Sequence, residues 1–303
     1  MGILEKIQAA SAHNGITQLP KHTLMYLARR VGWKSSNLAQ RLDDSLAEKS
    51  ILREYRSVLQ RNEKFRNLHR GKRAFVIGNG PSLNRQDLSK LKEEVTFVTN
   101  SFWKHPIVDE WQPTYHFMAD PILFDGSESV GNYYRELTSR MPGSTLFVMH
   151  YAKSSIEEGE LLPSDKTFYL ALGGGIERIL AEDLDLTRMV PDIRSITELA
   201  LMAAIYMGCN PIYLMGCDHD WLAHRGVHFN FYEGGDLQDH PLANSTLNNP
   251  YQDDLKNVLH VWNSYSILKK YADKRGIKIF NASAGGFLDV FDVVFYDSLF
   301  GQK

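Results

Sequence analysis

The sequence predicts an α/β protein with a mostly parallel, doubly wound sheet and an N-terminal helical extension. Short all-apolar runs recur after residue 73, as expected of strands that are buried on both faces. Helical patterns separate the later runs, so strands and helices alternate along the chain. Residues 1–72 read as helices, the longest of them polar with a thin apolar stripe.

Seven apolar runs are predicted strands, and most of them end in a polar residue. They are AFVIG (74–78), VTFVTN (95–100), YHFMAD (115–120), STLFVMH (144–150), KTFYLAL (166–172), PIYLMGCD (211–218) and IKIFNAS (277–283). The predicted helices 195–208 and 253–276 precede the last two strands. Because parallel strands have their carboxyl ends at one edge of a sheet, these polar residues are predicted to converge on one crevice.

Charge and composition divide the chain into an arm and a body. Residues 1–72 carry about 14 Lys and Arg against about 6 Asp and Glu, so the rest is net acidic by roughly ten charges. We predict a basic helical N-terminal arm (1–72) and a nucleotide-binding α/β catalytic domain (73–303). The aperiodic stretch 222–250 is long enough to be an active-site lid. Alternatively, the arm is a solvated helix without a partner.

The hydropathy and the cysteines of the sequence limit where in the cell the protein is expected, and its aromatic residues limit the expected partners. No run of 18 apolar residues occurs, and the N-terminus lacks the pattern of a secretory signal. The two cysteines, Cys209 and Cys217, lack metal-ligand spacing and are expected to be reduced. We therefore expect a cytoplasmic protein whose arm makes peripheral contact with the inner membrane face. Nucleic acid is not an expected partner, because aromatic residues are not interleaved with the basic ones.

The turn Gly-Asn-Gly-Pro-Ser (78–82) follows the first predicted strand and precedes a predicted helix in RQDLSKLKEE (85–94). Strand, glycine turn and helix is an arrangement that holds phosphate or nucleotide on backbone N–H groups. The glycines would let the backbone approach a ligand. The motif lacks the third glycine of the dinucleotide fingerprint and the Gly-Lys-Ser/Thr of a P-loop. An ordinary turn is the alternative.

Three blocks of sequence resemble a known group of transferases. VIGNGPSL with VTFVTNSF resembles the opening of bacterial CMP-sialic-acid-dependent sialyltransferases. It also resembles the wider family of motility-associated flagellin glycosyltransferases and MptE-like 6-hydroxymethylpterin diphosphokinases. SITELALMAAIYMGCNPIYLMGCD resembles their helix–strand unit ending in Gly-x-Asp, and IKIFNASAGGFLDVF resembles their final strand and loop. The resemblance spans about residues 73–292 and implies a Rossmann or GT-A-like fold.

The resemblance also implies a set of nucleotide-binding residues. The glycine turn and the asparagine after the second strand match positions that contact CMP, and Asp120 stands where an asparagine is expected. The predicted set is Gly78, Asn79, Gly80, Pro81, Ser82, Asn100, Asp120, Ser195 and Gly216.

The predicted catalytic residues lie in and before the lid. The resembled sialyltransferases use a histidine after the lid as general base, and a base needs a pKa near neutrality. His228 is the first candidate, because apolar neighbours would fix its ring, and His240 is the second. Asp218 is a further catalytic candidate. Tyr232, His219 and Asp220 are predicted to serve the lid or the leaving group.

The Asp-His-Asp stretch leaves the metal question open. A CMP sugar has one phosphate, and the resembled sialyltransferases work without metal, so no cofactor is expected. Asp218 and Asp220 are the candidate ligands if a diphosphate donor requires Mg²⁺.

The leading functional prediction is an inverting glycosyltransferase of cell-surface glycan biosynthesis. It would transfer a sugar, with a CMP-linked nonulosonic (sialic-type) acid as the first candidate, to a glycan or protein acceptor. The alternatives are an ATP-dependent MptE-like pterin diphosphokinase and a non-catalytic nucleotide-binding module. Homo-oligomerisation stays open, as do the sugar, the acceptor and the linkage.

Overall fold

The computed structural model describes residues 48–124, 127–227, 229–233 and 249–301. The chain divides into two compact units, Met1–Glu54 and Tyr55–Lys303. Of the first unit, the described residues 48–54 are helical. The second unit contains the sheet. The predicted base candidates His228 and His240 lie outside the described residues, as does most of the predicted lid.

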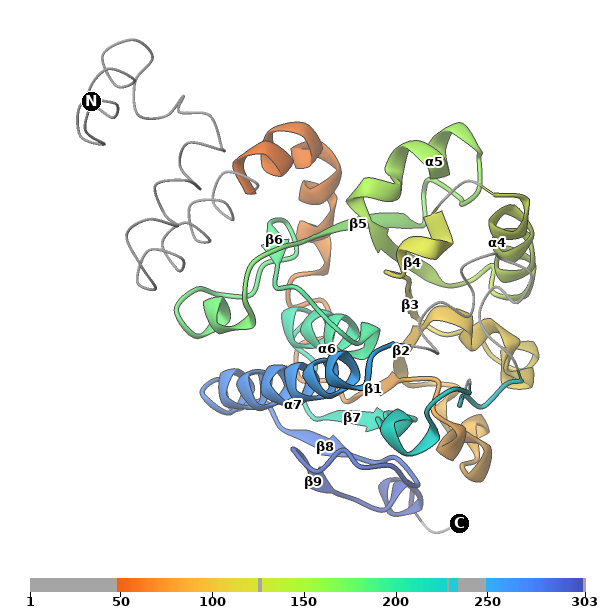
Figure 1. The fold of residues 1–303 in the computed structure, drawn as a ribbon, viewed down its shortest axis with the longest axis vertical. Coiled ribbons are helices and arrows are strands. Elements are labelled where there is room, and N and C mark those ends of the chain that lie inside the picture. The colour runs from red at the N-terminus through yellow and green to blue at the C-terminus, as the bar shows by residue number, and fades with distance from the viewer. Residues whose placement is uncertain (1–47, 125–126, 228, 234–248, 302–303) are drawn as a thin grey trace. The chain divides into compact units, whose positions relative to one another are not determined.

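The second unit is built on a parallel sheet, which confirms the predicted fold class (Figure 1). Nine strands occur in the order β6-β5-β4-β3-β2-β1-β7-β8-β9, and every pair is parallel. The strands are β1 (Ala74–Ile77), β2 (Val95–Thr99), β3 (Tyr115–Phe117), β4 (Thr145–Met149), β5 (Thr167–Leu172), β6 (Met189–Val190), β7 (Ile212–Met215), β8 (Ile279–Asn281) and β9 (Asp292–Val293).

The strand order reverses between β1 and β7. From β1 the chain builds the sheet outward to β6 and then returns to place β7 on the other side of β1. Ala74 pairs with Val95 of β2 and with Ile212 of β7, so β1 is hydrogen-bonded on both edges. Ligands of open α/β sheets bind beyond the carboxyl ends of the strands at such a reversal. The loops after β1 and β7 are therefore the place to look for a site.

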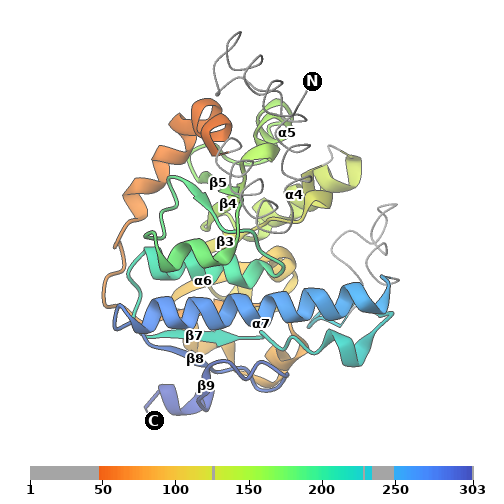
Figure 2. The same ribbon diagram turned by 60° about the vertical axis from the view of Figure 1, so that its left-hand side comes forward.

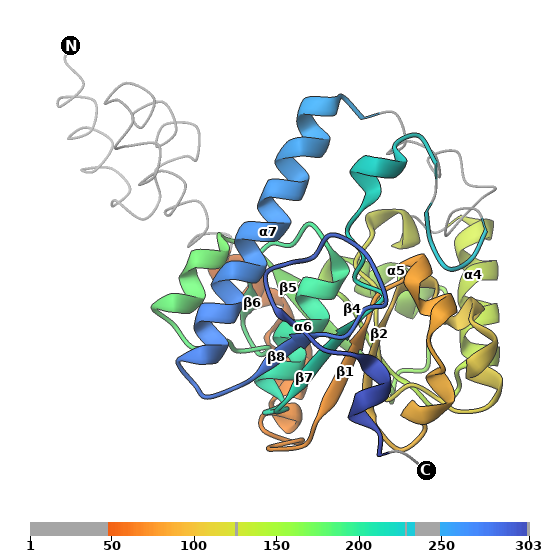
Figure 3. The ribbon, with the colours of Figure 1, turned by 90° about the horizontal axis from the view of Figure 1, so that it is seen from below.

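The helices of this unit lie on the two sides of the sheet. They are α4 (Glu128–Arg140), α5 (Lys153–Glu158), α6 (Ile196–Tyr206) and α7 (Tyr251–Asp273). Helix α6 packs on β1, β2 and β3, and α7 packs on α6 (Figure 2). The short turns that follow β1 and β2 lie on the other side of these strands (Figure 3). Every residue of α6 after Ile196 is buried, which explains why its sequence lacks a polar stripe.

One local prediction is wrong. Instead of a helix over 85–94, the chain forms two 3-10 turns, Pro81–Arg85 and Leu88–Leu91. Leu88 and Leu91 are the buried residues of the second turn, and their spacing of three matches the 3-10 period. The sequence also gives no sign of β6 and β9, because two residues are too few to show a pattern.

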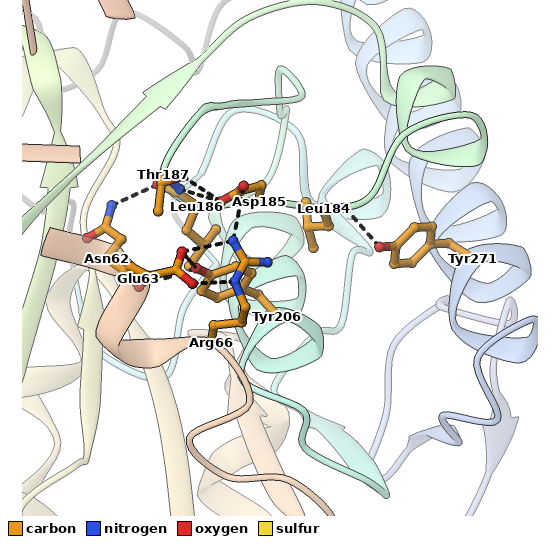
Figure 4. Close-up of polar contacts among 9 residues, drawn as sticks. All are labelled: Asn62, Glu63, Arg66, Leu184, Asp185, Leu186, Thr187, Tyr206 and Tyr271. Atoms are coloured by element: carbon orange, nitrogen blue, oxygen red, sulfur yellow. Dashed lines mark hydrogen bonds and ion pairs between the residues drawn. The ribbon is translucent and has the colours of Figure 1, made fainter. Parts of the chain in front are cut away.

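The last part of the predicted arm packs on the sheet unit (Figure 4). Leu59 and Phe65 are buried in its core. The buried Asn62 donates to the carbonyl oxygens of Tyr169 and Leu186, at 2.7 and 2.8 Å. The sequence left open whether the arm packs on the body. Residues 55–72 do so, and the arm boundary near residue 72 marks the start of the sheet and not the start of the compact unit.

Arg66 fixes the loop before β6 to the same segment. Its guanidinium forms ion pairs with Glu63 and Asp185, at 2.7 and 3.0 Å, and these partners raise its pKa further. Tyr271 of α7 accepts a hydrogen bond from the backbone N–H of Leu184 in that loop (Figure 4). Within the described ranges, no helix is long and apolar enough to cross a membrane.

Candidate functional site

The loops after β1 and β7 contact each other through glycines. A Cβ on Gly78 would lie 2.5 Å from the carbonyl oxygen of Gly216, and one on Gly80 would lie 2.7 Å from the same oxygen. Gly216 has φ +56, and its carbonyl accepts a hydrogen bond from the Gly80 N–H at 2.8 Å. The glycines of the turn therefore allow close approach to the neighbouring loop, a role that the sequence assigned to ligand approach.

Asp218 joins these two loops to a third. Its carboxylate accepts from the backbone N–H of Ser82 at 2.9 Å and from the Ser82 hydroxyl at 2.5 Å. Its carbonyl oxygen accepts from the N–H of Phe287, in the loop after β8. Burial raises the pKa of Asp218, although the hydrogen bonds from Ser82 oppose this. Asp218 therefore acts as the joint between three loops.

This joint changes the expected role of the turn. Gly80 and Ser82 donate their N–H groups to the 216–218 loop, and Pro81 has no N–H. The following element is a five-residue 3-10 turn and not an α-helix, so it supplies no helix N-terminus. The N–H groups of Gly80 and Ser82 are thus already hydrogen-bonded within the protein, and the turn does not present a row of free N–H groups to a phosphate.

Buried side-chain oxygens without a hydrogen-bond partner among the described residues follow β1 and β2 instead. Asn79 donates its Nδ2 to the carbonyl oxygen of Thr99 at 3.1 Å, while its Oδ1 is buried without a partner among the described residues. Asn100 follows β2 with φ +43, and its Oδ1 is also buried without a hydrogen-bond partner among the described residues. Buried acceptors are normally hydrogen-bonded, so two unpaired amide oxygens at this edge indicate a missing donor.

His116 of β3 adds a third such atom. Its Nε2 lies 2.5 Å from the carbonyl oxygen of Asn100, which can only accept, so Nε2 carries the proton. Burial lowers the pKa of His116 to about 4, and the ring is therefore neutral at physiological pH. Its Nδ1 is then an acceptor, buried without a partner in the described part of the chain.

The described segment 229–233 of the predicted lid contacts this edge. Phe231 donates its N–H to the carbonyl oxygen of Asn79 and accepts from the Asn84 side chain. Its ring contacts those of Phe102 and His105, in and just after the turn that follows β2. Tyr232 lies beneath the Lys104 ammonium, 4.6 Å from its ring centroid. The segment 229–233 therefore lies against the loops that carry Asn79 and Asn100.

His219 does not fit the role of a base. It is buried with φ +48, and its Nε2 lies 2.9 Å from the hydroxyl of Tyr265 in α7. Tyr265 lies 2.6 Å from the Thr197 hydroxyl, so this chain of polar groups ends at the start of α6. Burial lowers the pKa of His219 to about 3. Such a ring binds a proton too weakly to accept one from an alcohol.

His224 has the surroundings that a base requires. The carboxylate of Asp220 lies 3.6 Å from its Nε2, and its ring stacks on Phe229 at 3.5 Å between centroids. Asp220 is the N-terminal cap residue of the short 3-10 turn Trp221–His224, and His224 is its last residue. This turn lies beyond the end of β7 (Figure 3). We did not predict this pair from the sequence. The signal was the Asp-x-x-x-His spacing, which brings two side chains together on one helical turn.

The start of α6 contains a buried carboxyl group. Ser195 is the N-terminal cap residue of α6, and its hydroxyl bonds the Thr197 hydroxyl and not the helix backbone. Glu198 accepts from the N–H of Arg194 at 3.0 Å, and its other oxygen is buried without a partner among the described residues. Ser-x-x-Glu is a capping-box spacing, so the sequence contained the signal for this role. Burial raises the pKa of Glu198 to about 8.

Glu198→Gln is expected to remove a pH dependence of stability. The folded protein holds this proton more tightly than the unfolded chain, whose value is near 4.5. The resulting stability is complete below that value and is lost as the pH rises to about 8. The stability of the variant relative to the wild type should therefore rise by about 4 kcal/mol between about pH 5 and pH 9. Urea unfolding of the variant and the wild type at both pH values measures this rise. A difference in unfolding free energy that is the same at both pH values would contradict the burial of Glu198.

The remaining acidic candidates do not form a metal site with each other. Asp120 accepts from the N–H of Ile122 at 3.2 Å, Asp218 is occupied by Ser82, and Asp220 faces His224. Among the described residues, no group of three His, Cys, Asp or Glu side chains could hold a metal ion. Mg²⁺ bound together with a nucleotide takes most of its ligands from phosphate oxygens and water, so Asp218 and Asp220 stay predicted ligands.

Comparison with known proteins finds one family model. It is described as 6-hydroxymethylpterin diphosphokinase MptE-like and matches residues 49–223. The match contains the glycine turn, Asn100, Asp218 and the Asp220–His224 turn up to residue 223. No curated protein matches the chain.

Three solved structures resemble this one distantly. The MAf glycosyltransferase from Magnetospirillum magneticum AMB-1 is 15% identical with a TM-score of 0.44, over 80% of this chain and 38% of that one. The Campylobacter jejuni sialyltransferase CstII, with the substrate analogue CMP-3FNeuAc, is 14% identical with a TM-score of 0.41, over 73% and 86% of the chains. CST-II with a trisaccharide acceptor and CMP is 14% identical with a TM-score of 0.43, over 74% and 86%. This chain thus spans 38% of the MAf protein.

Proposed function

We propose, from the premise that this chain belongs to the 6-hydroxymethylpterin diphosphokinase MptE-like family, that it is a nucleotide-dependent transferase acting on a hydroxyl acceptor. The observation that carries this proposal is the pair of buried, unpaired amide oxygens of Asn79 and Asn100. They lie at the carboxyl ends of β1 and β2, beside the reversal of strand order. Amide oxygens there suit the hydroxyl donors of a ribose or the amino group of a base.

The transferred group is proposed to be a sugar from a CMP-linked donor, with a nonulosonic acid as the leading candidate. A donor with a single phosphate requires less charge neutralisation than a diphosphate. The contacts of Asp218 favour a donor with a single phosphate, because the Asp218 carboxylate already accepts two hydrogen bonds from Ser82. Asp220 faces His224 and is suited to orienting a base.

The transfer would proceed with inversion at the anomeric carbon. His224 takes the proton of the acceptor hydroxyl while Asp220 stabilises the imidazolium that forms. The acceptor oxygen forms a bond to the anomeric carbon as the bond from that carbon to the phosphate oxygen breaks. CMP leaves with the electron pair. The segment 229–233, which already lies against the nucleotide edge, would keep water away from the donor.

Diphosphoryl transfer from ATP to a pterin alcohol is the second candidate, because the family model carries that name. Such a reaction shares the nucleotide edge and the base, and it differs in its need for Mg²⁺. His240 and its neighbours in 234–248 lie outside the described residues and remain predicted candidates for either reaction.

A thermal-shift panel of CMP, CDP, UDP, GDP and ATP, each with and without Mg²⁺, tests the proposal. CMP at about a hundred times its Kd should stabilise the fold by roughly 2.7 kcal/mol without metal. Asn100→Ala should weaken CMP binding about tenfold, because a buried hydrogen bond is lost. Asn132→Ala is the control, an exposed amide within α4. A shift with ATP and Mg²⁺ alone favours the second candidate, and no shift with any nucleotide refutes both.

A further inference from the structure

A pocket of about 640 Å³ lies beside the joint formed by Asp218, on the β8 and β9 side. Its wall consists of the loop after β8, residues 281–286, and of residues 293–297 around β9. Arg85 and Lys90, from the two 3-10 turns after β1, line the same pocket. The glycine loop of the pocket contacts the Ser82–Asp218 joint, since a Cβ on Gly286 would lie 2.3 Å from Asp218, and the pocket has none of the residues of the candidate nucleotide edge in its lining.

Arg85 is a cation without a hydrogen-bond or ion-pair partner among the described residues. Its Nη2 lies where a Cβ of Gly285 would be, at 2.3 Å from that position, so the guanidinium rests on the glycine backbone. Burial raises the pKa of Asp218, the Arg85 charge opposes this rise, and the Asp218 carboxylate accepts its hydrogen bonds from Ser82. Lys90, by contrast, is paired with Asp297 at 2.8 Å. Arg85 can therefore offer its planar guanidinium to a carboxylate or phosphate.

The glycine loop beside Arg85 adds backbone donors. Gly286 has φ +98, and a Cβ there would lie 2.3 Å from the Cα of Asp218, so glycine is required. Phe287 donates its N–H to Asp218, whereas the N–H groups of Gly285 and Gly286 have no partner among the described residues. Successive free N–H groups next to a guanidinium form a concave site for an anion.

The pocket lining also contains apolar side chains. Phe295 is 85% exposed and Val293 is 69% exposed, although both are large apolar residues. Leu288, which is buried, lines the same pocket. An exposed aromatic ring and a guanidinium in one pocket suit a ligand that carries both an anionic group and an apolar ring or chain.

We propose that this pocket is the acceptor subsite and that it takes an acceptor carrying a carboxylate or phosphate next to an apolar ring or chain. The anionic group binds Arg85 and the N–H groups of Gly285 and Gly286, and the apolar part contacts Phe295. The role of this pocket as an acceptor subsite rests on the transferase function proposed above. The binding of an organic anion in the pocket is independent of that function.

Two simple probes, phenyl phosphate and benzoate, test the site and separate the two anion types. Binding is measured by ligand-observed NMR on the full chain, in the wild type and in the variants Arg85→Ala and Lys90→Ala. Arg85→Ala should weaken the preferred probe about tenfold, because a charged hydrogen-bond pair is lost. Lys90→Ala is the matched control from the same pocket and should change binding less than about twofold, since Asp297 already neutralises Lys90. Inorganic phosphate is the control probe without a ring. Phe295→Ala should weaken the binding of phenyl phosphate and benzoate and leave the binding of inorganic phosphate unaffected.

A second measurement keeps this proposal separate from the proposed function. CMP and the preferred probe are titrated together. An acceptor subsite predicts that both bind at once and that Arg85→Ala leaves the CMP affinity within about twofold. The acceptor subsite is refuted if neither probe binds the wild type, if Lys90→Ala loses as much as Arg85→Ala, or if CMP displaces the probe. A normal probe result without any CMP binding refutes the transferase and leaves an organic-anion site.

Discussion

Replacing Gly80 by alanine is expected to lower the free energy of unfolding by about 3 kcal/mol. The added Cβ would lie 2.5 Å from the Asp218 carboxylate and 2.7 Å from the carbonyl oxygen of Gly216. Gly80 has φ −63, which alanine adopts without strain, so the whole effect comes from this clash. The loops after β1 and β7 must separate, and the hydrogen bonds between Ser82 and Asp218 weaken as they do.

Urea unfolding of the variant measures this loss, and Gly131→Ala is the control. Gly131 lies within α4, where a Cβ would meet nothing within 4 Å. Alanine there should raise the stability by about 0.5–1 kcal/mol through helix propensity alone. Equal stability changes in the two variants would contradict the contact between the loops.

Replacing His224 by alanine is expected to reduce turnover about 10²- to 10⁴-fold, the usual contribution of a general base. CMP affinity should stay within about twofold, because the ring touches Asp220 and Phe229 and not the nucleotide edge. The measurement is acceptor-dependent release of CMP from the donor that the nucleotide panel selects. Asp220→Asn should lower the rate in the same direction but less, since it leaves the imidazole in place.

His228→Ala and His240→Ala are the comparison variants, because the sequence favours these two histidines. Both should retain most of the activity if His224 is the base. A large loss in either, with His224→Ala still active, would assign the base to the region outside the described residues. Melting temperatures of all variants separate lost chemistry from lost folding.

The sequence by itself determined the architecture of the sheet. Runs such as AFVIG and PIYLMGCD lack polar alternation, and this predicted strands covered on both faces. The alternation of these runs with apolar helices predicted a parallel sheet, and the polar residues after the strands predicted which edge holds the site. The prediction of the fold class is confirmed, because burial on both faces requires apolar residues along the whole strand, independently of distant contacts. The site at that edge stays a prediction.

The tertiary structure alone decided what the individual residues do. Gly78 and Gly80 looked like a ligand turn, and their close contacts are with Gly216 and Asp218, more than 130 positions away. Asp218 looked like a metal ligand or catalytic residue, and both of its oxygens are bonded to Ser82. The pocket around Arg85 likewise joins segments that are 200 residues apart. A side chain's role follows from its partners, and no local pattern in the sequence records which distant loop will supply them.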